Sequence, residues 1–231
     1  MQYTNAPDQL EEVQEEIRVA AQKAGRKPEE ISLVAVSKLH PWQAIQTLAQ
    51  AGHKDFGENY IQEALQKQEE LQREDLRWHF IGHLQSNKAK FVPGNFHLVH
   101  TVDSLKLARA LHKKAKEHNI RQSILLQADL AGEEQKSGVP KKELPNLVEE
   151  VLKLPHLDLQ GLMCMPPFFQ DGEKTRPYFI ELRQCRDQLA ERFALQLPHL
   201  SMGMTADFVQ AIEEGATLVR IGTRIFGPRP E

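Results

Sequence analysis

Cysteine is scarce in this sequence. Cys164 and Cys185 are the only two cysteines among 231 residues. Two cysteines cannot build a disulfide framework, and their separation does not match the short spacing of metal-binding cysteine pairs. We therefore interpret both as reduced thiols of a protein from a reducing compartment, and we expect no metal site.

Long apolar runs and an excess of one charge are also missing. No run approaches the roughly 18 apolar residues of a membrane-spanning helix. The opening "MQYTNAPDQLEEVQEEI" lacks the basic start and apolar core of a signal peptide. Twenty-nine basic against 32 acidic residues give a net charge of -3, without a basic block typical of nucleic-acid binding. We expect a cytoplasmic protein that binds neither membranes nor nucleic acid.

Nothing in the sequence marks a boundary between domains. There is no internal repeat, low-complexity segment or linker rich in Pro, Gly and Ser. Hydrophobic residues make up 40% of the chain, which is enough for a sizeable core. Length alone allows one large domain or two small ones. We predict a single domain over residues 1–231.

Short β-rich runs alternate with longer helical stretches after a first amphipathic helix over residues 8–25. This alternation predicts an α/β fold with parallel strands. The predicted strands cover residues 31–37, 54–57, 77–81, 97–102, 122–128, 158–164, 198–201 and 217–222, and the predicted helices cover 41–51, 59–73, 104–118, 141–153, 173–193 and 206–214. Eight strands indicate a closed (β/α)8 barrel, although a doubly wound open sheet could hold a similar set. Polar residues follow the hydrophobic strands and favour the barrel, which concentrates its chemistry at the C-terminal mouth.

Lys38 follows the first predicted strand, in "ISLVAVSKLHPWQAI" (31–45). Side chains alternate along a strand, so Val34, Val36 and Lys38 share one face. If that face lines the barrel, Lys38 is the last inward position at the mouth. Poor solvation there would favour the neutral amine, a nucleophile that can attack a carbonyl group. The alternative is a lysine that leaves the strand for solvent.

A second polar group lies near the C-terminus, in "LSMGMTADFVQAIEEGATLVRIGTRIFGPR" (200–229). Ser201 and Thr205 precede a predicted helix, and Gly222 and Thr223 follow the last predicted strand. Hydroxyls and backbone amides at helix starts can bind an anion, and the last two strands of this barrel class often carry a phosphate site. The alternative is helix capping by Ser201 and Thr205 and a plain turn at Gly222.

Arg220 lies on the same face as Leu218 and Gly222, opposite Val219 and Ile221. A guanidinium inside a barrel needs a partner, either a structural ion pair or a ligand. A carbonyl-reactive lysine and a phosphate site at one mouth together indicate a phosphorylated carbonyl compound as ligand, and Arg220 could donate to a ring nitrogen of that compound.

These motifs resemble the YggS/PROSC family of pyridoxal 5'-phosphate (PLP) binding proteins, also called PLP homeostasis proteins. The similarity extends in order across nearly the whole chain and is specific in combination. The matching stretches are "LVAVSK" (33–38), "FGENYIQEA" (56–64), "WHFIGHLQSNK" (78–88), "GEEQKSGV" (132–139), "GLMCMPPF" (161–168), "LSMGMTADF" (200–208) and "VRIGTRIFGPR" (219–229).

The resemblance implies a single-domain modified TIM barrel, similar to the N-terminal domain of alanine racemase, with PLP held as a Schiff base on Lys38. It also implies that Ser201, Thr205, Gly222 and Thr223 cradle the phosphate.

The same resemblance places Arg220 at the pyridine nitrogen and Asn59 beside the ring, with His79 and Met163 as further pocket residues. A permanent cation at the pyridine nitrogen discourages protonation there, so the cofactor would be a weak electron sink.

The function implied by the resemblance is PLP homeostasis: storage, buffering or delivery of the cofactor to PLP-dependent apo-enzymes, without substrate turnover. Three alternatives stay open, namely a low-activity amino-acid racemase, a lysine-dependent aldolase of phosphorylated sugars, and a regulatory protein that PLP only orders. Because no second racemase-type domain is expected, we expect a monomer.

Overall fold

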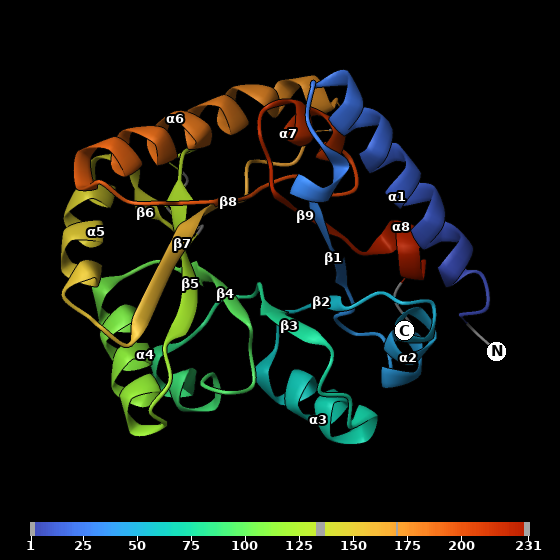
Figure 1. The fold of residues 1–231 in the computed structure, drawn as a ribbon, viewed down its shortest axis with the longest axis horizontal. Helices are drawn as coiled ribbons and strands as arrows, with labels where there is room; N and C mark the ends of the chain where they lie inside the picture. The colour runs from blue at the N-terminus through green and yellow to red at the C-terminus, as the bar shows by residue number, and fades with distance from the viewer. Residues whose placement is uncertain (1–2, 133–136, 170, 229–231) are drawn as a thin grey trace.

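The computed structural model describes residues 3–132, 137–169 and 171–228, and it shows a ring of parallel strands surrounded by helices (Figure 1). The ring consists of β1 (Ser32–Val36), β2 (Asp55–Glu58), β3 (Arg77–Phe80), β4 (Leu98–Val102), β5 (Gln122–Asp129), β7 (Leu157–Cys164), β8 (His199–Ser201) and β9 (Leu218–Ile221). A short extra strand, β6 (Val139–Pro140), pairs with β5.

Two pairings close the sheet into a barrel. β1 pairs with β9, with Val34 opposite Arg220, and β4 pairs with β5. A doubly wound open sheet would leave two edges where this ring has none. The predicted (β/α)8 barrel is therefore confirmed, and each of the eight predicted strands lies within one residue of its predicted bounds.

Helices cover the outside of the ring. They are α1 (Ala6–Lys23), α2 (Trp42–Gln50), α3 (Ile61–Leu71), α4 (Leu105–Glu117), α5 (Leu144–Leu152), α6 (Arg176–Phe193), α7 (Phe208–Glu213) and α8 (Thr223–Phe226). Short 3-10 turns are η1 (Pro28–Glu30), η2 (Ser86–Phe91), η3 (Lys141–Glu143) and η4 (Gly172–Lys174). η2 takes the place of a helix between β3 and β4, and α7 is shorter than predicted.

The apolar spacing of each helix explains which face it buries. In α5, Leu144, Leu147, Val148 and Val151 recur every three or four residues and are all buried. A proline in the first turn starts this helix without the loss of a needed amide. The helices thereby seal the outer surface of the strands.

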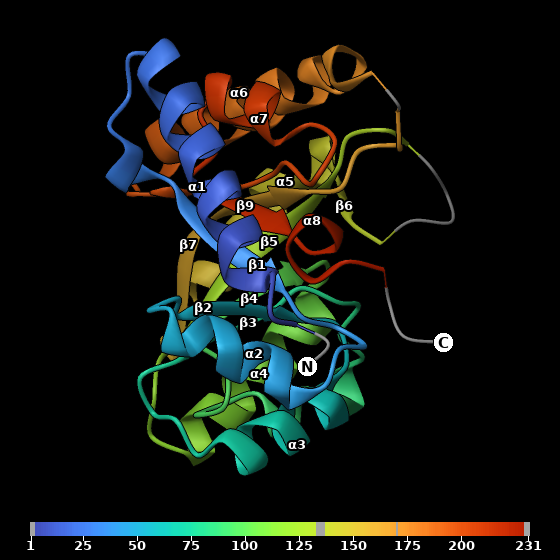
Figure 2. The same ribbon diagram turned by 90° about the vertical axis from the view of Figure 1, so that its right-hand side faces the viewer.

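The barrel has two separate apolar layers. Val34, Leu98, Leu125, Met163 and Leu218 form a small cluster inside the ring, whereas the larger core lies between the strands and the helices and includes Leu33 and Ala35. The alternation predicted for β1 is thus confirmed. The strands run toward the side of the molecule that carries α8 (Figure 2), so their C-terminal ends form one mouth there.

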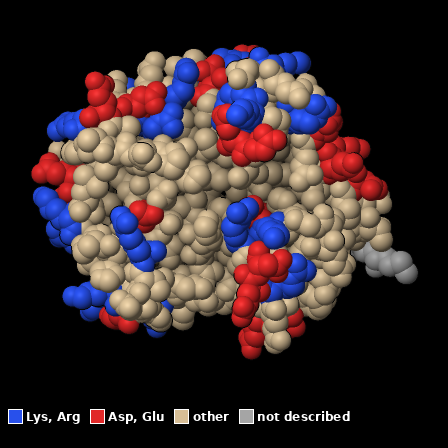
Figure 3. Space-filling view, in the orientation of Figure 1, with Lys and Arg blue, Asp and Glu red and all other residues tan. Residues whose placement is uncertain are grey.

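The surface carries charges of both signs. On the face shown in Figure 3, basic and acidic side chains lie beside one another around the edge and in a cluster near the centre, with uncharged areas between them. Among the described residues, no helix has the length and apolar character that crossing a membrane requires. Cys164 and Cys185 are both buried and free. Burial raises the pKa of the Cys164 thiol to about 12, which keeps it protonated.

Candidate functional site

The C-terminal mouth of the barrel contains a cavity of about 150 Å³. Its lining comes from the ends of β1, β2 and β9 and from the loops after β3, β7 and β8. The lining residues are Val36, Lys38, His40, Asn59, Ile81, Met165, Met204, Thr205, Arg220, Gly222 and Thr223. Six of the seven residues expected to bind the cofactor therefore share one cavity, and Ser201 is the seventh.

Lys38 lies two residues beyond the end of β1 and lines the cavity together with Val36. Its side chain is half-buried, so it does not simply leave the strand for bulk solvent. The chain then turns sharply: the His40 amide donates to the Ser37 carbonyl over 3.0 Å, and Leu39 has a positive φ of 63°. Such a conformation is rare for leucine and requires support from neighbouring groups.

That support comes from a network behind the turn. Lys67 on α3 donates to the carbonyl oxygen of Ser37 over 2.8 Å and to carboxylate oxygens of Glu58 and Glu63 over 2.7 and 2.6 Å. Glu63 in turn accepts the Leu39 amide at 2.6 Å, and Glu58 accepts the Ser37 hydroxyl at 2.6 Å. The residues on both sides of Lys38 are thus held by side chains of the next βα unit.

Glu58 is fully buried in this network. Burial raises its pKa to about 7, although Lys67 and the Ser37 hydroxyl act in the opposite direction. One cation here faces the two carboxylates of Glu58 and Glu63, so a proton on Glu58 brings the three groups to neutrality. Its second oxygen, Oε2, has no hydrogen-bond partner among the described residues.

Arg220 projects from β9 into the cavity and is only 4% exposed. It donates to the Ser201 hydroxyl over 2.6 Å and to the Cys164 carbonyl over 3.1 Å. Within the described residues it forms no ion pair with a carboxylate, so the structural ion pair considered above is absent from that part of the chain. Burial lowers the pKa of the guanidinium, which nevertheless stays charged at neutral pH.

Three backbone and side-chain features leave polar atoms available at the cavity. Asn59 Oδ1 is buried and has no hydrogen-bond partner among the described residues. The amides of Thr223 and Arg224 open α8 and donate to no group in the described part of the chain. Gly222 lies against β1, and a Cβ atom there would come within 3.0 Å of the Val36 carbonyl oxygen. These atoms could bind a small polar ligand.

Ser201 is the last residue of β8. It is completely buried in the barrel and does not line the cavity; its hydroxyl contacts Arg220 and, at 2.8 Å, His100 Nδ1. Thr205 does line the cavity, and it does not cap α7, because Asp207 is the N-cap residue. Since α7 and α8 are so short, a helix dipole contributes little to this site.

Two further expectations concern His79 and Met163. Neither is among the side chains that line the cavity. Met163 belongs to the apolar cluster inside the ring, and His79 is bonded to Asp55 and His100 within the barrel. Among the described residues, no group of three His, Cys, Asp or Glu side chains could hold a metal ion.

Sequence reasoning missed the residues that support the site. His40 lines the cavity, stacks on Phe226 at a ring distance of 5.1 Å, and has its Nδ1 3.2 Å from the Tyr3 hydroxyl. Glu58 and Lys67 stand nine positions apart, and nothing in their spacing shows that both are buried. The only available signal for Glu58 was its position in "GENY", immediately before Asn59.

Known proteins resemble this chain over almost its full length. Residues 9–230 match the family described as alanine racemase, N-terminal domain. The pyridoxal phosphate homeostasis protein of Aquifex aeolicus is 45% identical over 225 residues, covering 97% of this chain and 99% of that protein. The protein of the same name from Escherichia coli is 41% identical over 229 residues, covering 95% of each chain.

Solved structures give the same result. PipY of Synechococcus elongatus, determined with PLP bound, superposes with a TM-score of 0.82 at 37% identity, over 91% of this chain and 98% of that one. Alanine racemase of Corynebacterium glutamicum superposes with a TM-score of 0.71 at 20% identity, over 95% of this chain and 61% of the racemase, which shows likeness of fold alone. The chain belongs to the pyridoxal phosphate homeostasis protein family, built on the fold of the alanine racemase N-terminal domain.

Proposed function

We propose that this protein binds PLP in the cavity at the C-terminal mouth and serves PLP homeostasis rather than substrate turnover. Lys38 would hold the cofactor covalently through its amine. Thr205, Gly222 and Thr223 would hold the phosphate, Arg220 would face the pyridine nitrogen, and Asn59 would lie beside the ring. Ser201 supports the cofactor through Arg220 in this proposal.

One observation carries the proposal: a half-buried lysine, a buried arginine that forms no ion pair within the described residues, and the glycine and threonine that open α8 line one small cavity. The polar atoms at this cavity are of the kind that PLP could pair. Among the described residues Asn59 Oδ1 has no donor, and the amides of Thr223 and Arg224 have no acceptor, which a phosphate oxygen would supply. The relatives named pyridoxal phosphate homeostasis proteins and the PLP complex of PipY support the same ligand.

Bound PLP supplies an aldehyde and an electron-withdrawing ring. Arg220 limits what the ring can do, because a guanidinium cannot give a proton to the pyridine nitrogen and discourages protonation there. The chain would therefore retain the cofactor without strongly activating bound amino acids. This chemistry favours a carrier over an enzyme.

Exposed apolar side chains next to the cavity support delivery of the cofactor to PLP-dependent apo-enzymes. Leu39 adjoins Lys38, and Tyr60 adjoins Asn59; they are 47% and 54% exposed. Met165 lines the cavity and is 41% exposed, and Phe168 in the same loop is 77% exposed. Isolated exposed apolar residues are common, but four around one mouth suit contact with another protein.

The absorption spectrum of protein loaded with PLP tests the proposal directly. We expect a yellow protein whose visible absorption band disappears on borohydride reduction. The reduced cofactor should then be found covalently attached to Lys38. The Lys38→Ala variant should lack the reducible band, and Lys88→Ala, which removes a lysine outside the cavity, should keep it. A colourless wild-type protein that binds a phosphorylated sugar carbonyl instead would overturn the proposal in favour of an aldolase.

Proton exchange separates the carrier from a weak racemase. We expect no loss of the α-proton of L-alanine in heavy water at a catalytic rate, because the electron sink is weak and Lys38 would have to serve both faces of the substrate. The measurement is NMR of the α-proton with wild type and Lys38→Ala in parallel. Exchange at enzymatic rates that depends on Lys38 would show racemase-type chemistry.

A further inference from the structure

A continuous chain of hydrogen bonds runs through the inside of the barrel and ends at Arg220. We name it the axial relay. Its links are Arg220 Nη1 to Ser201 Oγ at 2.6 Å, Ser201 Oγ to His100 Nδ1 at 2.8 Å, His100 Nε2 to His79 Nδ1 at 3.0 Å, His79 Nε2 to Asp55 Oδ1 at 2.9 Å, and Asp55 to the Arg77 guanidinium.

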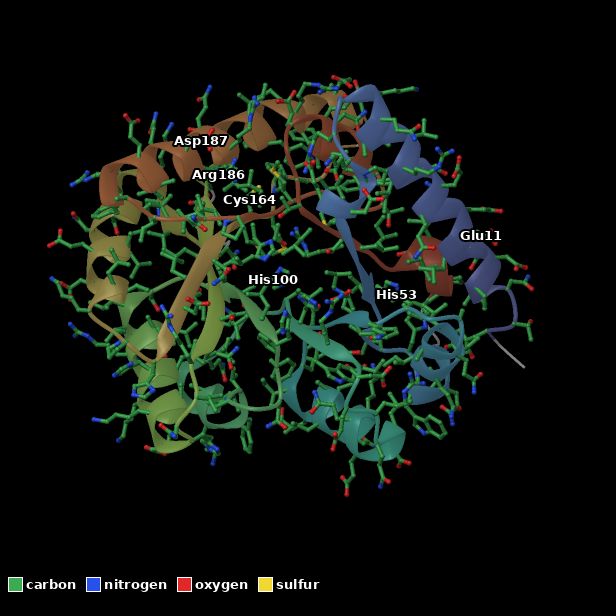
Figure 4. The ribbon with its side chains drawn as sticks, viewed as in Figure 1. Glu11, His53, His100, Cys164, Arg186 and Asp187 are labelled. Carbon is green, nitrogen blue, oxygen red and sulfur yellow. The ribbon has the colours of Figure 1, made fainter. Side chains whose placement is uncertain are left out.

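The axial relay connects the two ends of the barrel. Asp55 and Arg77 are the first residues of β2 and β3, and Arg220 reaches the cavity at the opposite end. His100 and Ser201 have no exposed surface, and Figure 4 places His100 within the ring of strands. At the N-terminal end the Arg77 side chain is 51% exposed, and the Asp55 side chain beside it is 11% exposed.

The protonation of two members limits the possible directions of the links. His100 is neutral because its burial lowers its pKa well below the ordinary value, so it carries one N–H. Asp55 is ionised, with a pKa of about 2 that its hydrogen bonds to His79 and Arg77 produce against the effect of burial. The nitrogen of His79 that faces Asp55 must therefore donate.

One arrangement then satisfies every group. Arg220 donates to Ser201, the Ser201 hydroxyl donates to His100 Nδ1, His100 Nε2–H donates to His79 Nδ1, and His79 Nε2–H donates to Asp55. In the reverse arrangement the Ser201 oxygen accepts from both Arg220 and His100. Its own hydrogen is then left without an acceptor among the contacts of the described residues, at a cost that buried hydroxyls rarely incur.

We propose that Ser201, His100 and His79 are positioning residues that aim the Arg220 guanidinium into the cavity, and that Asp55, which is paired in turn with Arg77, fixes the far end of the relay. A carboxylate placed directly against Arg220 would occupy its donors and neutralise its field at the ligand. The axial relay supplies a hydrogen-bond acceptor instead, while the negative charge stays at the far end of the barrel. The part of this proposal that concerns PLP rests on the function proposed above.

Further titratable groups lie beside the relay. His97 lies beside His79 at a ring distance of 5.7 Å. Both His97 and His199 have their pKa lowered, chiefly by burial. His53 next to Asp55 is lowered for the same reason. Among the described residues, Asp55 is the only carboxylate hydrogen-bonded to the relay, and the Arg77 guanidinium balances its charge. Near the other end, the charge of Asp207 acts to raise the pKa of Arg220.

Nitrogen-15 NMR of histidine-labelled protein without PLP tests the relay independently of cofactor binding. At pH 7.5 we expect both His79 and His100 to carry a proton on Nε2 and none on Nδ1, because each Nδ1 accepts a hydrogen bond in the proposed relay. An Nδ1–H tautomer or a doubly protonated ring at His100 would overturn the proposal, because the chain of donors would then be broken or reversed.

The Asp55→Asn variant tests transmission along the relay. Arg77 and His79 then compete for one amide oxygen, so we expect the nitrogen shifts of His100, which does not touch residue 55, to move toward the Nδ1–H form. Asp75→Asn alters an exposed aspartate paired with Arg73 and should leave them unchanged. Unmoved His100 shifts in a folded Asp55→Asn protein would overturn the proposal.

Ser201→Ala removes the link beside Arg220 and tests its effect on the ligand. We expect PLP affinity to fall by about tenfold or more, as for the loss of a hydrogen bond to a charged group, with a shifted visible band that is still reducible on Lys38. Ser123→Ala on β5 is the matched control and should keep both properties. Unchanged affinity and spectrum in Ser201→Ala would overturn the positioning role, whereas a wild-type protein that does not bind PLP would overturn only the proposed function.

Discussion

At the scale of single residues, the turn that carries Lys38 depends on groups outside its own strand. Leu39 holds a left-handed conformation, and Ser37 and Leu39 are bonded to Glu58, Glu63 and Lys67. If Lys38 binds an aldehyde, as proposed, it must be held in one place while its neighbours stay fixed. The Glu58 network supplies that rigidity from the adjacent βα unit.

The raised pKa of Glu58 predicts a specific pH dependence of stability. Its value of about 7 in the folded protein exceeds the ordinary glutamate value, so the folded state binds this proton more tightly than the unfolded state does. The resulting stabilisation is complete below the unfolded pKa and is lost as pH rises toward 7. The Glu58→Gln side chain imitates the protonated acid and should keep that contribution at pH 8. The free energy of unfolding of the variant, relative to that of wild type, should therefore rise by on the order of 3 kcal/mol between pH 4.5 and pH 8.

Urea unfolding of wild type and Glu58→Gln at pH 5 and pH 8 measures this difference. Glu74→Gln alters an exposed glutamate and serves as the control. Its stability should follow that of the wild type at both pH values. A stability difference between Glu58→Gln and wild type that does not change with pH would show that Glu58 stays ionised throughout.

Residue alternation predicted part of this site and could not predict the rest. The inward positions of Val34 and Lys38 follow from a period of two along a strand, and Arg220 follows from the same rule on β9. The partners of these residues come from strands far away in the sequence. The contact between Ser201 and His100, which lie 101 positions apart, could therefore not be predicted from the sequence.

At the scale of elements, a single glycine shapes the pairing of β7 with both of its neighbours. The register of β7 against β5 shifts between Ile124 and Leu125, and Gly161 follows the shift. Gly161 has φ of 151°, and a Cβ atom there would lie 1.9 Å from the His199 carbonyl oxygen of β8. Neither the conformation nor the space admits a side chain.

Gly161→Ala should therefore destabilise the barrel severely, by roughly 3 kcal/mol or more, through both backbone strain and separation of β7 from β8. Gly94→Ala is the matched control: Gly94 also has positive φ, of 82°, but nothing lies within 4 Å of the added atom. The control should lose only about 1 kcal/mol. Equal losses in urea unfolding would mean that the contact with β8 is relaxed at little cost.

Elements were more predictable than their exact ends, because each strand has an apolar run and each long helix has an apolar stripe. α5 shows this in Leu144, Leu147 and Val151. The exceptions lack such a local pattern. β6 has only two residues and depends on β5, and α7 ends at Glu213 because Gly215, with φ of 97°, stops the helix before Ala216.

At the scale of the whole molecule, the cavity joins the two ends of the chain. Lys38 follows the first strand and Gly222 follows the last, and β1 pairs directly with β9 to close the barrel. Beside this pairing, α1 packs against α8, and Arg224 of α8 forms an ion pair with Glu16 of α1. A ligand that contacts both Lys38 and Thr223 therefore strengthens the closure on which the fold depends.

PLP should consequently stabilise the whole barrel and not only the mouth. With free PLP at about 100 times its Kd, linkage predicts a gain of about 2.7 kcal/mol in the free energy of unfolding, or roughly 5–10 °C in Tm for a chain of this size.

Pyridoxal, which has the aldehyde but lacks the phosphate, should give a much smaller shift at the same concentration, because it leaves the amides of Thr223 and Arg224 without an acceptor. The Lys38→Ala variant should retain part of the PLP shift, since the phosphate contacts remain. Thermal unfolding monitored by circular dichroism distinguishes these cases: equal shifts with pyridoxal and PLP would place the binding energy in the aldehyde alone and remove the phosphate from this end of the barrel.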